Sequence, residues 1–233
     1  MGLKSSRFVS VIPLLALIFL AGAKSSEPFV QSAAFDFKSM LGPPPATGSE
    51  QFRHEVGEML QWQSERTPAD VKRIADEVKM TPFIFSDALG AWFNPDELPY
   101  TAKFLDRVMK NAASIDRDAK EIFARPRPFL LDPRIHPCVA KDKSYSYPSG
   151  HATRSMVVAL TLAEMFPDHK NALLAKAWQI GSDRTLGGEH FPSDVVAGRI
   201  LGRAIFAKMD KNADFQADLE KARAECLAAE NVK

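Results

Sequence analysis

Hydrophobic residues recur at intervals of three and four positions over much of the chain, which is the spacing of helices that bury one face. Leu105, Val108 and Met109 follow this spacing in a segment that we expect to be helical over residues 96–112. The same spacing predicts four later helices, the first starting near Gly150, the second over 172–180, the third after Pro192 and the last over 214–229. No run of alternating apolar and polar residues indicates a strand, so the pattern predicts an all-α, single-domain helical bundle.

Helix start signals and a proline run divide the first half of the chain. Thr67-Pro68 and Asn94-Pro95 each predict an N-cap followed by proline at the first helical position. Gly42-Pro43-Pro44-Pro45 predicts a stiff, extended spacer. We therefore expect an N-terminal arm with this Pro-rich stretch over residues 24–48 and a helical domain over residues 49–233.

The N-terminus has the layout of a secretory signal peptide. Lys4 and Arg7 form a positive segment, an apolar run follows, and small residues that suit cleavage end at Ala23. The alternative is an uncleaved membrane anchor, but the run is short for a span and Pro13 interrupts it. We therefore interpret residues 1–23 as a signal peptide that is removed on export.

The net charge and the cysteine content narrow the classes of function that the sequence allows. Without Lys4 and Arg7 the formal net charge falls from +1 to −1, which gives no support for nucleic-acid binding. After signal cleavage no association with a membrane is expected. Cys138 and Cys226 could pair in an oxidising compartment, or they could be two unrelated thiols, and the sequence leaves both readings open. Their spacing is not that of a metal site.

Two short motifs offer groups that bind anions. Lys120 and Arg127, the latter followed by proline, supply a point charge and a planar guanidinium fork, although such a pair is more often a solvated surface feature. Ser149, Gly150 and His151 follow Pro148 at the start of an apolar helix, where free backbone N–H groups bind oxyanions. The competing interpretation is an ordinary capped helix with an incidental histidine.

A third motif supplies a nucleophile. Arg184, His190 and Asp194 follow in order, with Gly187 and Gly188 between the first two. If the turn before Pro192 is helix-like, His190 and Asp194 share a face, and Asp194 could accept the Nδ1 proton and leave Nε2 as nucleophile. A surface histidine beside a capping aspartate is the competing interpretation. The three motifs together supply cations, amide donors, a nucleophile and a second histidine, which is the set that phosphoryl transfer needs.

These motifs resemble the three-part signature of the type 2 phosphatidic acid phosphatase superfamily, which also includes vanadium haloperoxidases. With the signal peptide, the Gly42-Pro43-Pro44-Pro45 stretch and the overall length, the chain looks like the bacterial class A non-specific acid phosphatases. The resemblance implies an all-α core, a periplasmic location, hydrolysis of small-molecule phosphate monoesters without a metal or other cofactor, and a homo-oligomer. It also implies a role for each matching residue: phosphate binding for Lys120, Arg127, Ser149, Gly150 and Arg184, proton donation to the leaving alcohol for His151, nucleophilic attack for His190, and orientation of His190 for Asp194.

Three positions depart from the family pattern. Asp183 precedes Arg184 where the family has serine, Tyr145 stands where class A members have glycine, and Ala152 stands where they have threonine. An acid at position 183 would weaken phosphate binding if it pointed into the site. These departures bear on rate and substrate range more than on reaction type.

Other activities fit the same motifs. A vanadium-dependent haloperoxidase would hold vanadate in the same pocket, but such chains are usually much longer. A membrane-integral lipid-phosphate phosphatase would need spans after residue 23, and the sequence has none. The third alternative is a non-catalytic periplasmic phosphate-binding protein.

Overall fold

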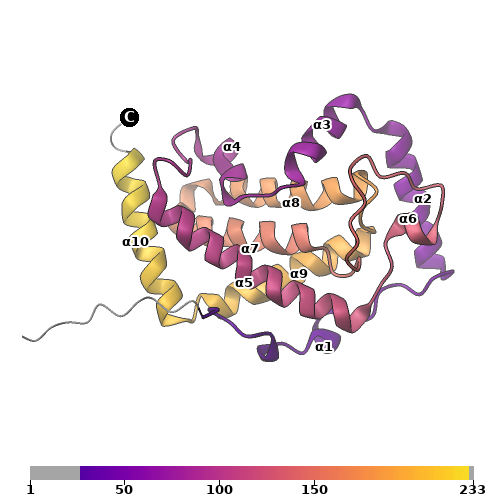
Figure 1. Cartoon of the computed structure of the whole chain (residues 1–233), viewed down its shortest axis with the longest axis horizontal. Helices are drawn as coiled ribbons and strands as arrows, with labels where there is room; N and C mark the ends of the chain where they lie inside the picture. Colours follow the sequence, from indigo (N-terminus) through magenta and orange to yellow (C-terminus); the bar gives the residue numbers. More distant parts are fainter. Residues whose placement is uncertain (1–26, 231–233) are drawn as a thin grey trace, which may run out of the picture.

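The computed structural model describes residues 27–230, which consist of helices joined by loops, with no strand among them (Figure 1). The elements in chain order are η1 (Ser32–Ala34), α1 (Phe37–Leu41), α2 (Glu50–Glu65), α3 (Pro68–Glu77), η2 (Pro82–Phe85), α4 (Ser86–Leu89), α5 (Pro99–Phe123), α6 (Pro128–Leu131), α7 (Gly150–Met165), η3 (Pro167–His169), α8 (Lys170–Leu186), α9 (Pro192–Met209) and α10 (Ala213–Glu230). The all-α prediction is confirmed. The predicted signal peptide lies outside the described residues.

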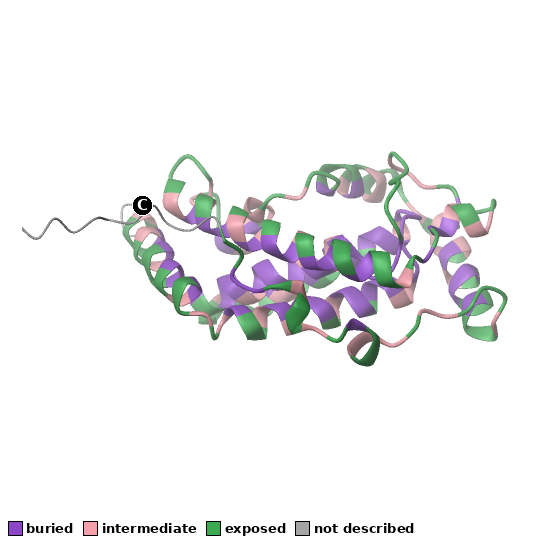
Figure 2. Cartoon of the chain, turned by 60° about the horizontal axis from the view of Figure 1, so that its bottom comes forward, coloured by how far each residue is buried: buried purple, intermediate pink, exposed green. Residues whose placement is uncertain are grey.

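Helix α7 forms the centre of the bundle and packs against α5, α8 and α9. It is apolar on nearly every side, which is the pattern of a helix surrounded by protein. Figure 2 shows buried residues concentrated along these central helices, with exposed residues on the outer surfaces. Helix α10 packs across α5, and its buried Phe215 meets the edge of Phe29 from the N-terminal arm.

Two glycines let α9 cross α7 at very short range. A Cβ atom on Gly198 would lie 2.5 Å from the carbonyl oxygen of Ser149, and one on Gly202 would lie 2.6 Å from that of Thr153. Both obstacles are backbone atoms, one at the N-cap of α7 and one in its first turn, and they cannot rotate away. The crossing holds the first turn of α7 against α9, and both helices contribute to the site described below.

Gly202→Ala should therefore destabilise the protein by about 1–3 kcal/mol, because the added methyl group forces the two backbones apart. Gly57→Ala is the matched control, since Gly57 lies within α2 and a Cβ there meets no described atom within 4 Å. The control should be neutral or stabilise by up to about 1 kcal/mol through helix propensity. Urea unfolding midpoints measure both, and equal midpoints for the two variants would contradict the close crossing.

The helix start signals had different outcomes. Thr67 caps α3 as predicted. Its hydroxyl accepts a hydrogen bond from the N–H of Asp70, and the carboxylate of Asp70 accepts one from the N–H of Thr67. The signal at Asn94-Pro95 was wrong, because Asn94 closes a local turn and α5 starts only at Pro99. Helix α5 also continues beyond the predicted end, as far as Phe123.

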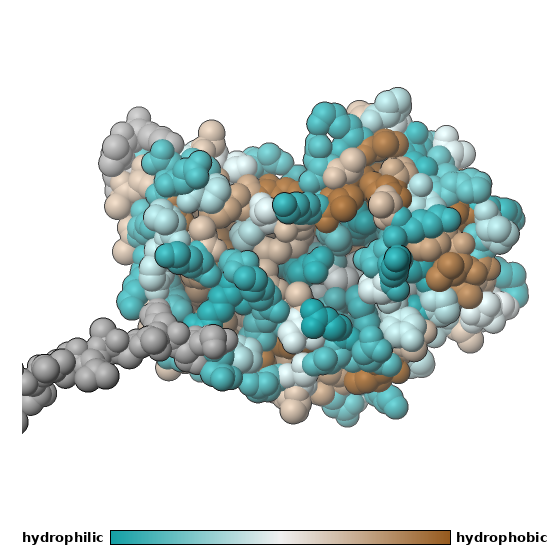
Figure 3. All heavy atoms as spheres, viewed as in Figure 1, coloured by the Kyte–Doolittle hydropathy of each residue, from teal (hydrophilic) through white to brown (hydrophobic). Residues whose placement is uncertain are grey.

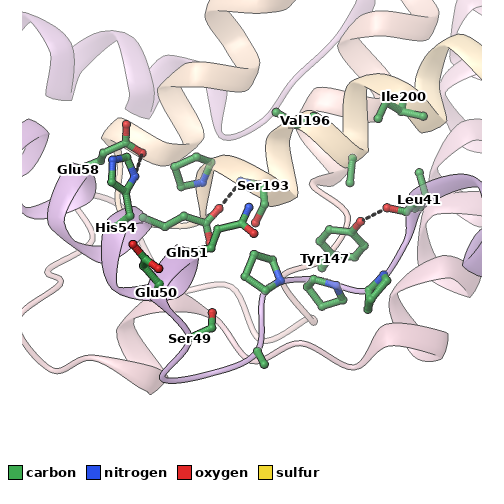
Figure 4. Close-up of a pocket in the computed structure, with 17 residues that line it drawn as sticks. Leu41, Ser49, Glu50, Gln51, His54, Glu58, Tyr147, Ser193, Val196 and Ile200 are labelled. Atoms are coloured by element: carbon green, nitrogen blue, oxygen red, sulfur yellow. Dashed lines mark hydrogen bonds and ion pairs between the residues drawn. The ribbon is translucent and has the colours of Figure 1, made fainter.

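The arm before α2 packs onto the bundle instead of standing apart from it. Phe29 and Phe37 are buried, and the hydroxyl of Tyr147 donates to the carbonyl of Leu41 at 2.8 Å. The proline run borders a groove of about 1030 Å³ whose other walls are α2 and α9 (Figure 4). The Pro-rich stretch is therefore the rim of a groove as well as a spacer.

Both cysteines are free thiols, so the pairing that the sequence left open is not made. Cys226 is buried on α10 with its sulfur 3.5 Å from the hydroxyl of Thr101, while the N–H of Cys138 donates to the carbonyl of Gly187, next to the end of α8. Within residues 27–230, no helix is long and apolar enough to cross a membrane.

Candidate active site

The three sequence motifs meet at one end of the central helices. Each contributing side chain lies at or near a helix end, where chain direction changes and backbone groups are free. The residues and their positions are Lys120 near the end of α5, Arg127 at the N-cap of α6, Ser149 at the N-cap of α7, Gly150 and His151 in the first turn of α7, Arg184 near the end of α8, His190 before α9, and Asp194 in the first turn of α9. All are buried except His151, which is half-buried.

His190 lies at the centre of this group, and the hydrogen bonds fix its tautomer. Arg127 Nη1 lies 3.1 Å from Nε2 of His190, and because a guanidinium only donates, Nε2 must be the unprotonated nitrogen. The proton is therefore on Nδ1. Burial lowers the pKa of His190 well below its ordinary value, and the charges of Arg127, Lys120 and Arg184 lower it further. The ring is therefore a neutral imidazole whose Nε2 lone pair faces cations.

Asp194 holds the other side of the ring less directly than the sequence implied. Its Oδ2 is 3.5 Å from Nδ1 of His190, longer than an ordinary hydrogen bond. The hydroxyl of Ser146 lies 3.4 Å from Nδ1 and donates to Oδ2 of Asp194 at 2.5 Å. The N–H of Phe191 also donates to this oxygen, at 2.8 Å. Asp194 and Ser146 together thus present two acceptors to the Nδ1 proton.

Arg125 is the cation that supports Asp194, and the sequence analysis missed it. Its Nη1 donates to Oδ1 of Asp194 at 2.5 Å, and its Nη2 donates to Glu55 of α2 at 3.0 Å. Glu55 also accepts the N–H of Ser193 at 2.7 Å, and the guanidinium lies 3.9 Å from the ring centre of Phe191. The alternating Arg-Pro-Arg-Pro sequence could have drawn attention to Arg125. Nothing in the sequence links it to Glu55, which lies 70 residues away.

Arg127 and Lys120 are held by oxygen acceptors around the ring. Arg127 donates to Ser144 and to the carbonyl of Glu189, and it pairs with Asp142 at 2.9 Å. Lys120 Nζ donates to the carbonyl of Tyr145 at 2.8 Å and also to that of Pro148. Burial lowers the pKa of Lys120. The loop before α7 therefore accepts hydrogen bonds from both cations.

Two residues of the motifs keep buried donors that no described residue satisfies. The hydroxyl of Ser149 and the Nε and Nη1 atoms of Arg184 have no hydrogen-bond partner among residues 27–230. Such groups are rare in proteins because each unmade hydrogen bond costs about 1–3 kcal/mol. Ser149 stands at the N-terminus of α7, whose first amides point outward and whose dipole favours an anion. Hydroxyl and guanidinium donors of this kind bind oxyanions, so these three atoms are candidate contacts for one.

His151 lies on the solvent side of the cluster, beneath the end of α3. Its Nε2 is 3.2 Å from the carbonyl of Val78, so this nitrogen carries the proton. Burial and the charge of Arg184 lower the pKa of His151 to about 3.

In Figure 3 the surface is notched between α4 and α3, where a pocket of about 400 Å³ lies against α8.

The three departures from the family pattern do not interrupt this cluster. Asp183 points away from it toward α3 and forms two bonds with Arg73, at 2.7 and 2.8 Å. Its charge is thus neutralised, and the concern that it weakens phosphate binding does not apply. Ala152 is fully buried at the place where Gly181 of α8 and Gly198 of α9 face α7. Tyr145 contributes its carbonyl to Lys120, and its side chain is exposed.

The groove of Figure 4 is a separate feature. None of the eight motif residues lines it, although Ser193 and Glu55 do, and both belong to the network that supports Asp194.

Comparison with known proteins agrees with this geometry. A family model described as the PAP2 superfamily matches residues 107–209. A non-specific acid phosphatase of Providencia stuartii is 32% identical over 207 residues, which cover 83% of this chain and 82% of that protein. An acid phosphatase of Zymomonas mobilis is 32% identical over 243 residues, covering 96% of this chain and 91% of that protein.

One solved structure extends the likeness to the fold. The transmembrane PAP2 type phosphatidylglycerolphosphate phosphatase from Bacillus subtilis superposes with a TM-score of 0.50 and 20% identity, over 75% of this chain and 90% of that one. Sequence relatives of this identity and coverage establish the family. The chain is a phosphatase and belongs to the PAP2 superfamily, among the bacterial class A non-specific acid phosphatases.

Proposed function

We propose that this protein is an exported periplasmic enzyme that hydrolyses small phosphate monoesters of varied structure, without a metal, through a phosphohistidine intermediate on His190. One observation carries the proposal. The neutral Nε2 of His190 faces an oxyanion site in which the buried donors of Ser149 and Arg184 have no partner in the described part of the chain. Export rests on the sequence of residues 1–23 and remains a prediction.

In the first step, Nε2 of His190 attacks phosphorus and the ester P–O bond breaks. The proton on Nδ1 remains in place, and Asp194 and Ser146 stabilise the positive charge that develops on the ring. Lys120, Arg127 and Arg184 stabilise the charge on the equatorial oxygens of the transition state. His151 gives a proton to the leaving alkoxide.

In the second step, water attacks phosphorus, the P–N bond breaks, and inorganic phosphate leaves with His190 restored. His151, which has just lost its proton, accepts one from the attacking water. Protein cations thus supply the charge stabilisation throughout. Among residues 27–230, no group of three His, Cys, Asp or Glu side chains is placed to hold a metal ion.

The role of His151 as an acid depends on the substrate. With a pKa of about 3, His151 is neutral at mildly acidic pH in the free protein. A phosphate dianion beside Arg184 offsets that guanidinium's charge, so it raises the pKa of His151 and favours the protonated form. The same dianion raises the pKa of His190, which must remain neutral to attack. We therefore expect a bell-shaped pH profile with its maximum on the acid side.

The test is p-nitrophenyl phosphate hydrolysis by the purified protein at mildly acidic pH, with and without excess chelator. We expect equal rates in the two conditions. Peroxide, halide and vanadate, added to a parallel sample, should give no halide oxidation. A rate that disappears with chelator would disprove metal independence, and halide oxidation without phosphatase turnover would favour a haloperoxidase.

A further inference from the structure

Asp116 places a carboxyl group directly against the proposed phosphate site. It lies on α5, one turn before Lys120, and is only 4% exposed. A Cβ atom on Gly150 would lie 2.7 Å from Oδ2 of Asp116, so the carboxyl group occupies the space over the first residue of α7. This is the helix N-terminus at which the unpartnered Ser149 hydroxyl stands.

Hydrogen bonding among the described residues leaves one oxygen of the Asp116 carboxyl group unsatisfied. Its Oδ1 atom has no hydrogen bond within residues 27–230. Lys120, the nearest candidate on the same helix, directs its Nζ to the carbonyls of Tyr145 and Pro148. A buried carboxyl oxygen without a partner is costly, so a ligand is the natural candidate for the missing contact.

The charges around Asp116 come from four segments. Lys120 faces it from α5, Arg154 from α7, Arg127 from the N-cap of α6, and Asp142 from the loop before α7. An ionised carboxylate here would repel a phosphate dianion held by the same cations. A neutral carboxylic acid would instead donate a hydrogen bond to a phosphate oxygen, as the Ser149 hydroxyl would under the proposed function. Burial raises the pKa of Asp116, which agrees with the neutral form.

We propose that Asp116 is a further substrate-contacting residue, whose protonated carboxyl group donates a hydrogen bond from Oδ1 to an oxygen of the bound phosphate. The inference rests on the proposed function and adds to it a group outside the three-part signature. It also has a consequence for pH. Once Asp116 ionises, the donor is lost and a negative charge faces the ligand, so oxyanion binding weakens as pH rises.

Sulfate is the probe that isolates this effect, because it is a tetrahedral dianion whose charge does not change between acidic and neutral pH. Its dissociation constant is measured by titration calorimetry at several pH values for the wild type, Asp116→Asn and Asp116→Leu. Asp106→Asn is the matched control, since Asp106 lies on the same helix and is 56% exposed. Any protonation of His151 or His190 that accompanies sulfate binding is common to all variants, so differences between variants report position 116.

Wild-type affinity should fall with rising pH, whereas Asp116→Asn, which keeps an N–H donor at every pH, should hold its affinity better and exceed the wild type at neutral pH. Asp116→Leu should bind about tenfold more weakly than the wild type at acidic pH, where the lost hydrogen bond counts most. Asp106→Asn should follow the wild type. Circular dichroism establishes that each variant is folded, and if the leucine variant is not, the asparagine variant decides alone.

Parallel pH curves for the wild type and Asp116→Asn would overturn the inference. If the wild type still hydrolyses p-nitrophenyl phosphate in that case, the proposed function stands and only the role of Asp116 fails. A wild type that is folded but neither hydrolyses the ester nor binds sulfate would overturn both.

Discussion

His190→Ala should reduce kcat for p-nitrophenyl phosphate by about 10³-fold or more, the range seen when a covalent nucleophile is removed. Alanine cannot form the P–N bond, because the substitution removes the Nε2 atom that lies 3.1 Å from Nη1 of Arg127. Steady-state kinetics of the purified variant measure the loss. His54→Ala is the control, because the His54 side chain is 73% exposed in the groove on the far side of the Asp194 network, and its kcat should equal that of the wild type.

The intermediate itself gives a second readout. Acidic conditions break a phosphohistidine bond and alkaline conditions preserve it. A rapid quench of the wild type with radiolabelled substrate should therefore leave base-stable, acid-labile label on the protein, and His190→Ala should carry none. Undiminished label in the alanine variant, or kcat within about tenfold of the wild type, would exclude His190 as the nucleophile.

Arg125→Met should destabilise the protein by about 3–5 kcal/mol, the usual effect of breaking a buried ion pair from one side. Arg125 is the shared partner of Glu55 and Asp194, which are both nearly or fully buried. Its removal leaves two uncompensated carboxylates in the interior. Activity should fall as well, because Asp194 loses the bond that fixes its orientation toward His190. Urea unfolding and kcat together measure the two effects.

Two comparisons test the physical reason. Arg134→Met removes a 66% exposed arginine paired with Asp132 and should change stability by less than about 1 kcal/mol. Adding Glu55→Gln to Arg125→Met removes one of the stranded charges, so the double variant should be more stable than the sum of the single changes predicts. Additive effects, or an Arg125→Met variant as stable as Arg134→Met, would show that the buried network contributes little.

The local sequence predicted those features that depend on a single segment of the chain, such as where a helix starts. The apolar spacing predicted the helical class and the starts of α7 and α9, because a helix buried on one side must repeat at its own period. Thr67-Pro68 marked the start of α3 correctly. Asn94-Pro95 carries the same local signal, but there Asn94 accepts the N–H groups of Asp96 and Glu97 in a short turn, and α5 begins only at Pro99. Two local signals of equal strength thus had different outcomes, and only the tertiary structure distinguished them.

The sequence by itself determined that this protein is helical and which residues could form the phosphate site, because the order of the motifs and the chemistry of their side chains do not depend on the fold. Only the tertiary structure decided the environment of those residues. It paired Asp183 with Arg73, left Cys138 and Cys226 apart, placed Ser146 and Asp194 together beside Nδ1 of His190, and brought Arg125, Glu55 and Asp116 to the site. These contacts join segments up to 110 residues apart, and the burial and charge of the residues involved depend on where the helices cross. No local pattern encodes that crossing, since it follows from how all the apolar faces pack at once.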